Sequence, residues 1–303
     1  MDRSVSYKGA RRGAAAELEP GPIEIRALAT REELDGCVEL QRETWGADYR
    51  EFVHPALLKV AQRVGGIAAG AFDGESGRLL GFVFGMSGVR GGRPVHWSHM
   101  LAVRPEARGA GLGRRLKLYQ RERLLELGID TVYWTFDPLV ARNAHLNLNR
   151  LGAQPVEYVR DMYGGTGSAL HDEIGTDRLV VEWRLADARV IRAVEGVLPF
   201  DPGICAGARV VNAAPEVAEV AGAFQPRPID PEVGGLQGFR IEIPGHIGRL
   251  QEAAPDVARA WRENTRAAFL AAFDHRYQVQ GFLRADDGRC FYCLQASSAA
   301  RPA

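Results

Sequence analysis

Between residues 22 and 186 the apolar positions alternate between the two-residue period of strands and the longer period of helices. The segments with strand patterns are Ile23–Leu28, Ile67–Phe72, Leu79–Met86, His96–Val103, Thr131–Phe136, Ala153–Met162 and Arg178–Leu185. The segments with helical patterns are Thr30–Trp45, Pro55–Val64, Leu112–Leu127 and Val140–Leu151. Thr30 and Glu33 have the spacing of a capping box at the first helix. This order of segments predicts a mixed α/β domain of the α+β type over residues 22–186.

Residues 187–303 predict a second, smaller α+β region. Pro- and Gly-rich connections at 197–204 and 224–235 separate its elements. Its predicted elements are two short strands, a helical stretch broken at a proline, and a hairpin, at Arg209–Asn212, Phe239–Ile243, His246–His275 with its break at Pro255, Tyr277–Leu283 and Arg289–Leu294. The layout of helix, strand, turn and strand repeats that of residues 59–86.

Composition and charge describe an ordinary globular protein. The net charge is zero, so neither nucleic acids nor membranes are predicted partners, and no apolar run reaches the length of a transmembrane helix. Residues 1–21 lack an apolar signal core and predict a disordered tail. Cys290 and Cys293 form one C-x-x-C pair without a second pair or histidines at zinc spacing, so no metal is expected. Together with Cys37 and Cys205 they are interpreted as free thiols of a cytoplasmic protein.

One stretch, His96–Leu127, combines a strand, a glycine-rich loop and a helix. Loops of this kind direct unpaired backbone N–H groups at an anion, and glycines let a phosphate approach closely. The loop residues predicted to bind a phosphate group are Arg108, Gly109, Ala110, Gly111, Leu112, Gly113 and Arg114. The spacing fits neither a Walker loop nor a dinucleotide-binding fingerprint. A structural glycine-rich turn is the alternative interpretation.

The pattern R-x-x-G-x-G from Arg108 to Gly113, preceded by "LAVRPEARG", resembles the GNAT superfamily of acyl-CoA N-acyltransferases. The resemblance covers residues 22–186. It implies a GNAT-type mixed, mostly antiparallel sheet flanked by helices, and a loop that holds the pyrophosphate of coenzyme A. In this light, residues 187–303 are either a degenerate second GNAT-like half, or a packing or dimerisation module that closes the acceptor pocket.

The same resemblance implies roles for the strand before the loop. A backbone N–H near Leu101 meets the thioester carbonyl, and Leu101, Ala102 and Val103 are the expected contacts of the acyl-CoA on this strand. The usual place of the general base holds His99, whose neutral imidazole can accept a proton near neutral pH. A structural histidine is the alternative. His96 lies three residues away and is expected to face the opposite side of the sheet.

The helix Val140–Leu151 departs from the family pattern. Leu148 stands where members typically carry a tyrosine that protonates the departing thiolate, and we expect Leu148 to be a core residue. Asn143 and Asn147 lie on a neighbouring polar stripe, which either contacts the coenzyme A arm or is a solvated helix face. Tyr158, Tyr163 and water are the candidate acids, and we favour Tyr163 among the side chains.

The predicted function is N-acylation of a primary amine on a small molecule or amino acid. Acetyl-CoA is the expected donor. Succinyl-CoA is a donor variant, because the long C-terminal extension resembles a subgroup in which amino-acid N-succinylation is one activity. Two alternatives stay open: a non-catalytic acyl-CoA-binding or regulatory protein, suggested by Leu148, and a protein acetyltransferase. A homodimer is compatible with the C-terminal region.

Overall fold

The computed structural model describes residues 22–164, 174–205, 207–212, 226 and 228–297. The tail predicted for residues 1–21 lies outside the described residues. In the described part of the chain, no helix has the length and apolar character needed to span a membrane.

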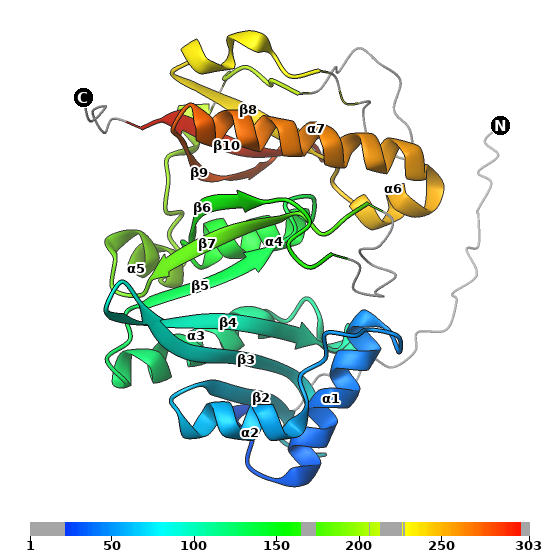
Figure 1. Ribbon diagram of the computed structural model, residues 1–303, viewed down its shortest axis with the longest axis vertical. Coiled ribbons are helices and arrows are strands. Elements are labelled where there is room, and N and C mark those ends of the chain that lie inside the picture. Colours follow the sequence, from blue (N-terminus) through cyan, green and yellow to red (C-terminus); the bar gives the residue numbers. More distant parts are fainter. Residues whose placement is uncertain (1–21, 165–173, 206, 213–225, 227, 298–303) are drawn as a thin grey trace, which may run out of the picture.

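The larger sheet contains seven strands in the order β1-β2-β3-β4-β5-β7-β6 (Figure 1). The strands are β1 (Ile23–Ala27), β2 (Ile67–Asp73), β3 (Leu79–Arg90), β4 (Arg93–Val103), β5 (Thr131–Phe136), β6 (Gln154–Val159) and β7 (Arg178–Arg184). All neighbouring strands are antiparallel except β4 and β5, which are parallel. The mixed, mostly antiparallel sheet confirms the predicted fold class.

Helices cover both faces of this sheet. One face carries α1 (Arg31–Trp45) and α2 (Pro55–Arg63), and the other carries α3 (Leu112–Glu126), which lies behind the strands in Figure 1. A short 3₁₀ turn, η1 (Pro105–Ala107), joins β4 to the loop before α3. The capping box predicted for α1 is present, because Thr30 Oγ1 accepts from Glu33 N and the Glu33 carboxylate accepts from Thr30 N.

Several element boundaries differ from the predictions. β3 and β4 extend through exposed residues to a tight turn at Gly91 and Gly92, whose positive φ angles of 58° and 76° suit glycine. The predicted helix Val140–Leu151 is instead a short α-helix, α4 (Ala141–Ala144), followed by a π-helical turn, η2 (His145–Arg150). The exposed ends of β3 and β4 have no apolar alternation, so the sequence pattern could not reveal them.

The second region has its own three-stranded sheet in the order β8-β10-β9. Its strands are β8 (Gly238–Ile243), β9 (Tyr277–Arg284) and β10 (Cys290–Ala296), and its helices are α5 (Ala188–Val194), α6 (Ile247–Ala253) and α7 (Pro255–Asp274), with 3₁₀ turns η3 (Pro202–Cys205) and η4 (Pro231–Gly235). The predicted break at Pro255 is confirmed. The strand predicted at Arg209–Asn212 is wrong, because only Val210 forms a single bridge, to Arg240. α5 was not predicted.

The two sheets share one continuous apolar core, which runs from β2 through β5 and β7 to α7 and β8–β10. The Asn149 side chain at the end of η2 bonds both backbone groups of Phe282 in β9, at 2.7 Å from Nδ2 to the carbonyl and 3.1 Å from N to Oδ1. Tyr292 of β10 donates to Pro138 O at 2.7 Å, directly after β5. The C-terminal region is therefore fixed to the part of the larger sheet beyond β4.

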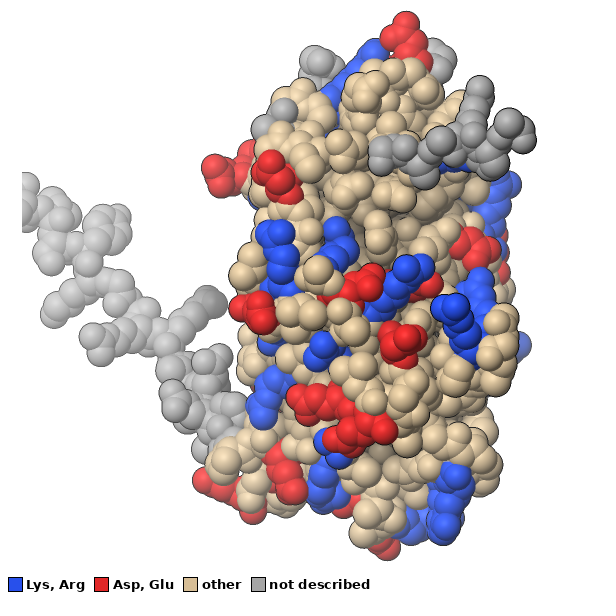
Figure 2. Space-filling model, turned by 90° about the vertical axis from the view of Figure 1, so that its left-hand side faces the viewer, with Lys and Arg blue, Asp and Glu red and all other residues tan. Residues whose placement is uncertain are grey.

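Positive and negative side chains are interspersed over the face shown in Figure 2. This mixture agrees with the zero net charge of the whole chain.

Candidate functional site

The parallel contact between β4 and β5 is short. Only His96↔Val132 and Trp97↔Tyr133 are in register, and beyond these pairs the two strands separate. A β-bulge lies at the same point: Ser98 opposes Gly85 and Met100 opposes Phe84, which leaves His99 as the extra residue of β4. Bulges bend a strand and increase its twist. The bulge therefore accounts for the divergence of β4 from β5 beyond these pairs, and the region between the diverging strands is called the wedge.

The backbone of β4 directs some of its polar groups into this wedge. Arg104 N donates to Leu80 O at 2.8 Å, which makes that pair a hydrogen-bonded one. Because antiparallel pairs alternate, Leu101 and Val103 are in non-hydrogen-bonded pairs, with N–H and C=O turned away from β3. Ala102 is in the intervening pair, so its backbone bonds to β3. Of the three predicted residues, Leu101 therefore offers both backbone groups to a ligand, and Val103 offers its N–H because its carbonyl accepts from Arg108 Nε.

The glycine-rich loop follows β4 at the mouth of the wedge. Gly109 and Gly111 have φ angles of 89° and 72°, and a Cβ at either position would meet open space. Gly111 is the N-cap of α3 and no side chain caps this helix. Arg115 N bonds Gly111 O at 3.1 Å, so the N–H groups of the preceding residues are left for a ligand. This helix N-terminus is suited to an anion.

Arginines surround the loop without carboxylate partners. Among the described residues, no ion pair involves Arg108, Arg114, Arg142 or Arg150. Burial and the charge of Arg108 lower the pKa of Arg142, and burial and the charge of Arg150 lower that of Arg114. An added anion would relieve this repulsion between like charges.

The Arg114 guanidinium, however, is turned away from the loop. Its NH2 donates to Val194 O at the end of α5, at 2.5 Å. Arg108 Nε donates to Val103 O at 3.1 Å, which keeps its guanidinium between β4 and the loop. Arg108 and Arg142 are thus the cations best placed for a phosphate, whereas Arg114 can contribute its backbone N–H.

The two histidines of β4 lie on opposite faces of the sheet, as expected. The His99 ring packs edge-on against Phe84 on the α1–α2 face, with the ring centroids 6.2 Å apart. Burial lowers the pKa of His99, and the nearby charge of Glu51 only partly opposes this. The imidazole is therefore neutral at neutral pH, in the form that accepts a proton.

Three polar residues that the sequence analysis did not select lie near His99 and Tyr163. They are Tyr49, Glu51 and Arg178. Burial and the charge of Glu51 raise the pKa of Tyr49 to about 12, and Tyr163 and Arg178 are close enough to act on the same phenol. Tyr49 lies between α1 and α2 and stacks on Trp45 at 5.5 Å. Tyr49 and Glu51 lie in a loop without a periodic pattern, so sequence patterning contains no signal for them.

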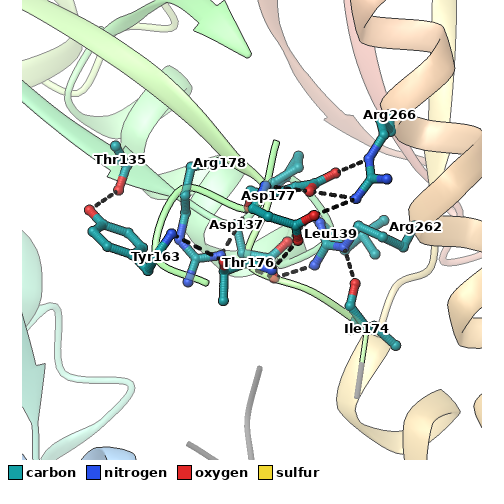
Figure 3. Close-up of polar contacts among 12 residues, drawn as sticks. Thr135, Asp137, Leu139, Tyr163, Ile174, Thr176, Asp177, Arg178, Arg262 and Arg266 are labelled. Atoms are coloured by element: carbon teal, nitrogen blue, oxygen red, sulfur yellow. Dashed lines mark hydrogen bonds and ion pairs between the residues drawn. The ribbon is translucent and has the colours of Figure 1, made fainter. Parts of the chain in front are cut away.

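Tyr163 lies on the same side of the sheet as this group. Its hydroxyl is 3.0 Å from Thr135 Oγ1 of β5, and its ring lies 5.4 Å from the Arg178 guanidinium (Figure 3). Tyr158 is excluded as an acid because its hydroxyl donates to Asp177 at 2.7 Å and burial raises its pKa further. Tyr163 and Tyr49 are therefore the phenols near the wedge.

The π-helical turn holds mostly structural residues. Leu148 is fully buried in the core, as predicted. Asn147 is buried and accepts from Trp134 Nε1 at 3.2 Å, so its carbonyl supports β5. Asn143 is half-buried in the turn that also carries Arg142, near the loop cations. Of the two asparagines, Asn143 is the better candidate for contact with a ligand.

Buried ion pairs connect the end of β5 and the start of β7 to α7 (Figure 3). Arg262 donates to Asp137 at 2.6 Å, and Arg266 binds both oxygens of Asp177 at 2.7 Å. Burial alone would raise the pKa values of both aspartates, but their arginine partners outweigh it and lower them. Both carboxylates are therefore ionised, and α7 supplies their counter-charges.

A buried lysine lies at the closed end of the wedge. Lys117 of α3 donates to Ser98 Oγ at 2.7 Å and to Gln120 Oε1 at 3.3 Å, and its Nζ lies 3.8 Å from the Trp134 ring centre. Burial lowers the pKa of Lys117 well below its usual value. The ring contact favours the charged form, but no carboxylate among the described residues pairs with this amine, so burial prevails.

The hydrogen-bond chain continues from Gln120 across β4. Gln120 Nε2 is 3.1 Å from His96 Nε2, and His96 Nδ1 is 3.0 Å from Ser87 Oγ, which donates to Gly65 O. Burial and then Lys117 lower the pKa of His96 to about 3. His96 is therefore a neutral structural residue that links β4 to β3 and α3.

Comparison with known proteins gives a match in the N-terminal part of the chain. A family model described as Acetyltransferase (GNAT) family matches residues 32–152, which is less than half of the chain. No curated protein matches the chain.

Similar solved structures are distant. The ribosomal-protein-S18-alanine N-acetyltransferase of Escherichia coli is 17% identical, with 55% of this chain and 96% of that chain covered and a TM-score of 0.42. An N-acetyltransferase of Staphylococcus aureus Mu50 is 16% identical, with 55% and 99% covered and a TM-score of 0.43. An aminoglycoside 6′-N-acetyltransferase complexed with coenzyme A is 16% identical, with 54% and 98% covered and a TM-score of 0.41.

The neutral state of Lys117 predicts a specific dependence of stability on pH. The unfolded chain protonates this lysine below its usual pKa and the folded protein does not, so the wild type gains stability as pH rises toward 10.5. The slope for one proton is about 1.4 kcal/mol per pH unit. Denaturant unfolding from pH 7 upward should show this slope reduced in Lys117→Met but not in Lys59→Met, which changes an exposed lysine of α2. Equal slopes in the two variants would show that Lys117 is charged in the folded protein.

Proposed function

We propose that the protein is an acyl-CoA-dependent N-acyltransferase that moves an acetyl group directly to a primary amine of a small molecule or amino acid. The observation that carries this proposal is the wedge between β4 and β5, which has an uncapped helix N-terminus at its mouth and the neutral imidazole of His99 at its bulge. Succinyl-CoA is retained as a donor variant.

Acyl-CoA binding uses groups that have no carboxylate partner in the described part of the chain. The N–H groups at the start of α3, together with Arg108 and Arg142, would hold the pyrophosphate. The N–H of Leu101 faces the wedge, where it can donate to a thioester carbonyl and to the oxyanion formed from it. The site would therefore match the charge of the pyrophosphate and the position of the thioester carbonyl.

His99 is proposed as the general base. The amine nitrogen attacks the thioester carbon, the C–S bond breaks, and the amine proton passes to His99 directly or through water. The products are an amide and coenzyme A, whose thiolate takes up a proton. Because burial keeps His99 neutral, it is ready to accept a proton without first losing one.

The departing thiolate has several sources for its proton. Tyr163 is one candidate, and Tyr49, which stays protonated because its pKa is raised to about 12, is a second. A thiol has an ordinary pKa near 8.5, so the thiolate is a weak base and water can also protonate it. Replacement of the usual tyrosine by Leu148 should therefore slow the reaction without stopping it.

A non-catalytic acyl-CoA-binding protein is the second candidate, and Leu148 is the observation that favours it. Its side chain is fully buried and has no proton to donate to a thiolate. Such a protein would keep the anion-binding loop and the wedge, but it would not release coenzyme A when an amine is added.

Replacing Gly111 tests the binding site. Both Asp and Asn tolerate the left-handed conformation of Gly111, and a Cβ there meets no other atom. Gly111→Asp should abolish coenzyme A binding in titration calorimetry because it places a negative charge at the helix N-terminus, whereas the isosteric Gly111→Asn should weaken binding only slightly. Wild-type binding should also weaken with added salt. If the Asp variant binds as tightly as the Asn variant, the pyrophosphate lies elsewhere.

Replacing His99 tests the chemistry. His99→Ala should lower kcat by roughly a hundredfold with little change in coenzyme A affinity. In the wild type, kcat/KM should fall only below pH 6.5, because the pKa of His99 is lowered, and the variant should lose this acid limb. The assay is free-thiol release from acetyl-CoA or succinyl-CoA with a panel of amines and amino acids.

The control for this experiment is His96→Asn, which changes the buried histidine on the other face of β4. It should lower stability but keep the acid limb of the pH profile. A rate for His99→Ala within threefold of the wild type would make His99 a structural residue. No amine-dependent release by a wild type that binds coenzyme A would favour the binding protein instead.

A further inference from the structure

Arg178, the first residue of β7, is a buried guanidinium with an incomplete set of partners. Its residue is only 6% exposed. NH1 donates to the carbonyl of the preceding residue at 2.9 Å, and its nearest carboxylate oxygen in the described chain, on Asp137, lies 3.8 Å away. That distance is too long for a hydrogen bond. A buried cation held in this way is costly unless another anion pairs with it.

The neighbouring carboxylates are already occupied. Asp137 binds Arg262 at 2.6 Å and also accepts from Leu139 N at 2.8 Å. Asp177 binds Arg266 through both oxygens. The cluster thus holds three arginines around two buried aspartates, and α7 provides two of these arginines (Figure 3). Among the described residues, Arg178 therefore carries the positive charge that no carboxylate pairs with closely.

The position of Arg178 relates this charge to the site. Its guanidinium lies over the Tyr163 ring, and its charge acts on Tyr49. Glu51, which lies near both Tyr49 and His99, supplies a negative charge in the same region. A positive group at one end and a negative group beside the proposed base match a substrate with a carboxylate and an ammonium group.

We propose that Arg178 binds the carboxylate of the substrate, and that the acceptor is an amino acid whose ammonium group is thereby directed toward Glu51 and His99. This inference rests on the proposed N-acyltransferase function and adds the class of acceptor. It also gives the C-terminal region a role: Arg262 neutralises Asp137, which leaves Arg178 available to the substrate. The terminal carboxylate of a succinyl donor is the other carboxylate that Arg178 could bind.

The test compares matched acceptors that differ only in the carboxylate. Each amino acid of a panel, in both its L and D forms, is assayed beside its α-carboxamide, with acetyl-CoA as donor and free-thiol release as readout. The wild type should have a higher kcat/KM for the carboxylate member of each accepted pair. Arg178→Gln should lower that value roughly ten- to a hundredfold, mainly through KM, and leave the carboxamide nearly unchanged.

Two further variants separate recognition from structure. Arg178→Lys keeps the charge and should retain part of the preference for the carboxylate. Arg184→Gln changes an exposed arginine at the other end of β7 and should not alter the preference. If Arg178→Gln does not fold, the inference is tested by the wild-type ratio of kcat/KM for carboxylate over carboxamide and by the same ratio in Arg178→Lys. Equal kcat/KM for both members of the pairs in the wild type, or an equal loss for both in the variants, would overturn the inference.

A second donor distinguishes the two sources of the carboxylate. Arg178→Gln could lower the rate with succinyl-CoA and a carboxamide acceptor, but not with acetyl-CoA and an amino acid. In that case Arg178 binds the terminal carboxylate of the donor, and its assignment to the acceptor is wrong. Transfer to carboxamides as efficient as transfer to amino acids would leave the N-acyltransferase function intact and remove only this inference. No transfer in any arm would remove both.

Discussion

The separation of β4 from β5 after two residue pairs is the constraint on which the proposed chemistry depends. A continuous parallel pair would use the N–H and C=O groups of Leu101 and Val103 within the sheet. The bulge at His99 breaks that pairing, directs these groups into the wedge, and places the imidazole on the α1–α2 face. The closed end of the wedge is held by Lys117 and its partners, which tie α3 to both strands without a carboxylate.

The C-terminal region matters because it completes the electrostatics of the first. Arg262 and Arg266 of α7 supply the closest counter-charges of two buried aspartates and keep them ionised. The amide of Asn149 joins the π-helical turn to β9, so the same region also fixes the helix that carries Arg142. Whether residues 187–303 derive from a second GNAT-like half stays a prediction.

The sequence predicted the elements whose pattern is local. The strand, loop and helix around Gly111, the capped helix α1 and the buried Leu148 follow from periodicity, capping residues and glycine spacing, and the structure contains all three. The polar group near His99 could not be predicted, because its members come from a loop and from the start of β7, far apart in the chain. The side-chain direction of Arg114 likewise depends on α5, which the sequence did not reveal.

The proposed function requires that the wedge between β4 and β5 holds an acyl-CoA. A crystal structure of the protein with acetyl-CoA tests it most directly. We expect a pyrophosphate on the N–H groups at the start of α3, a thioester carbonyl facing the N–H of Leu101, and an acetyl group beside His99. A ligand bound away from the wedge, or a thioester that does not reach His99, would contradict it.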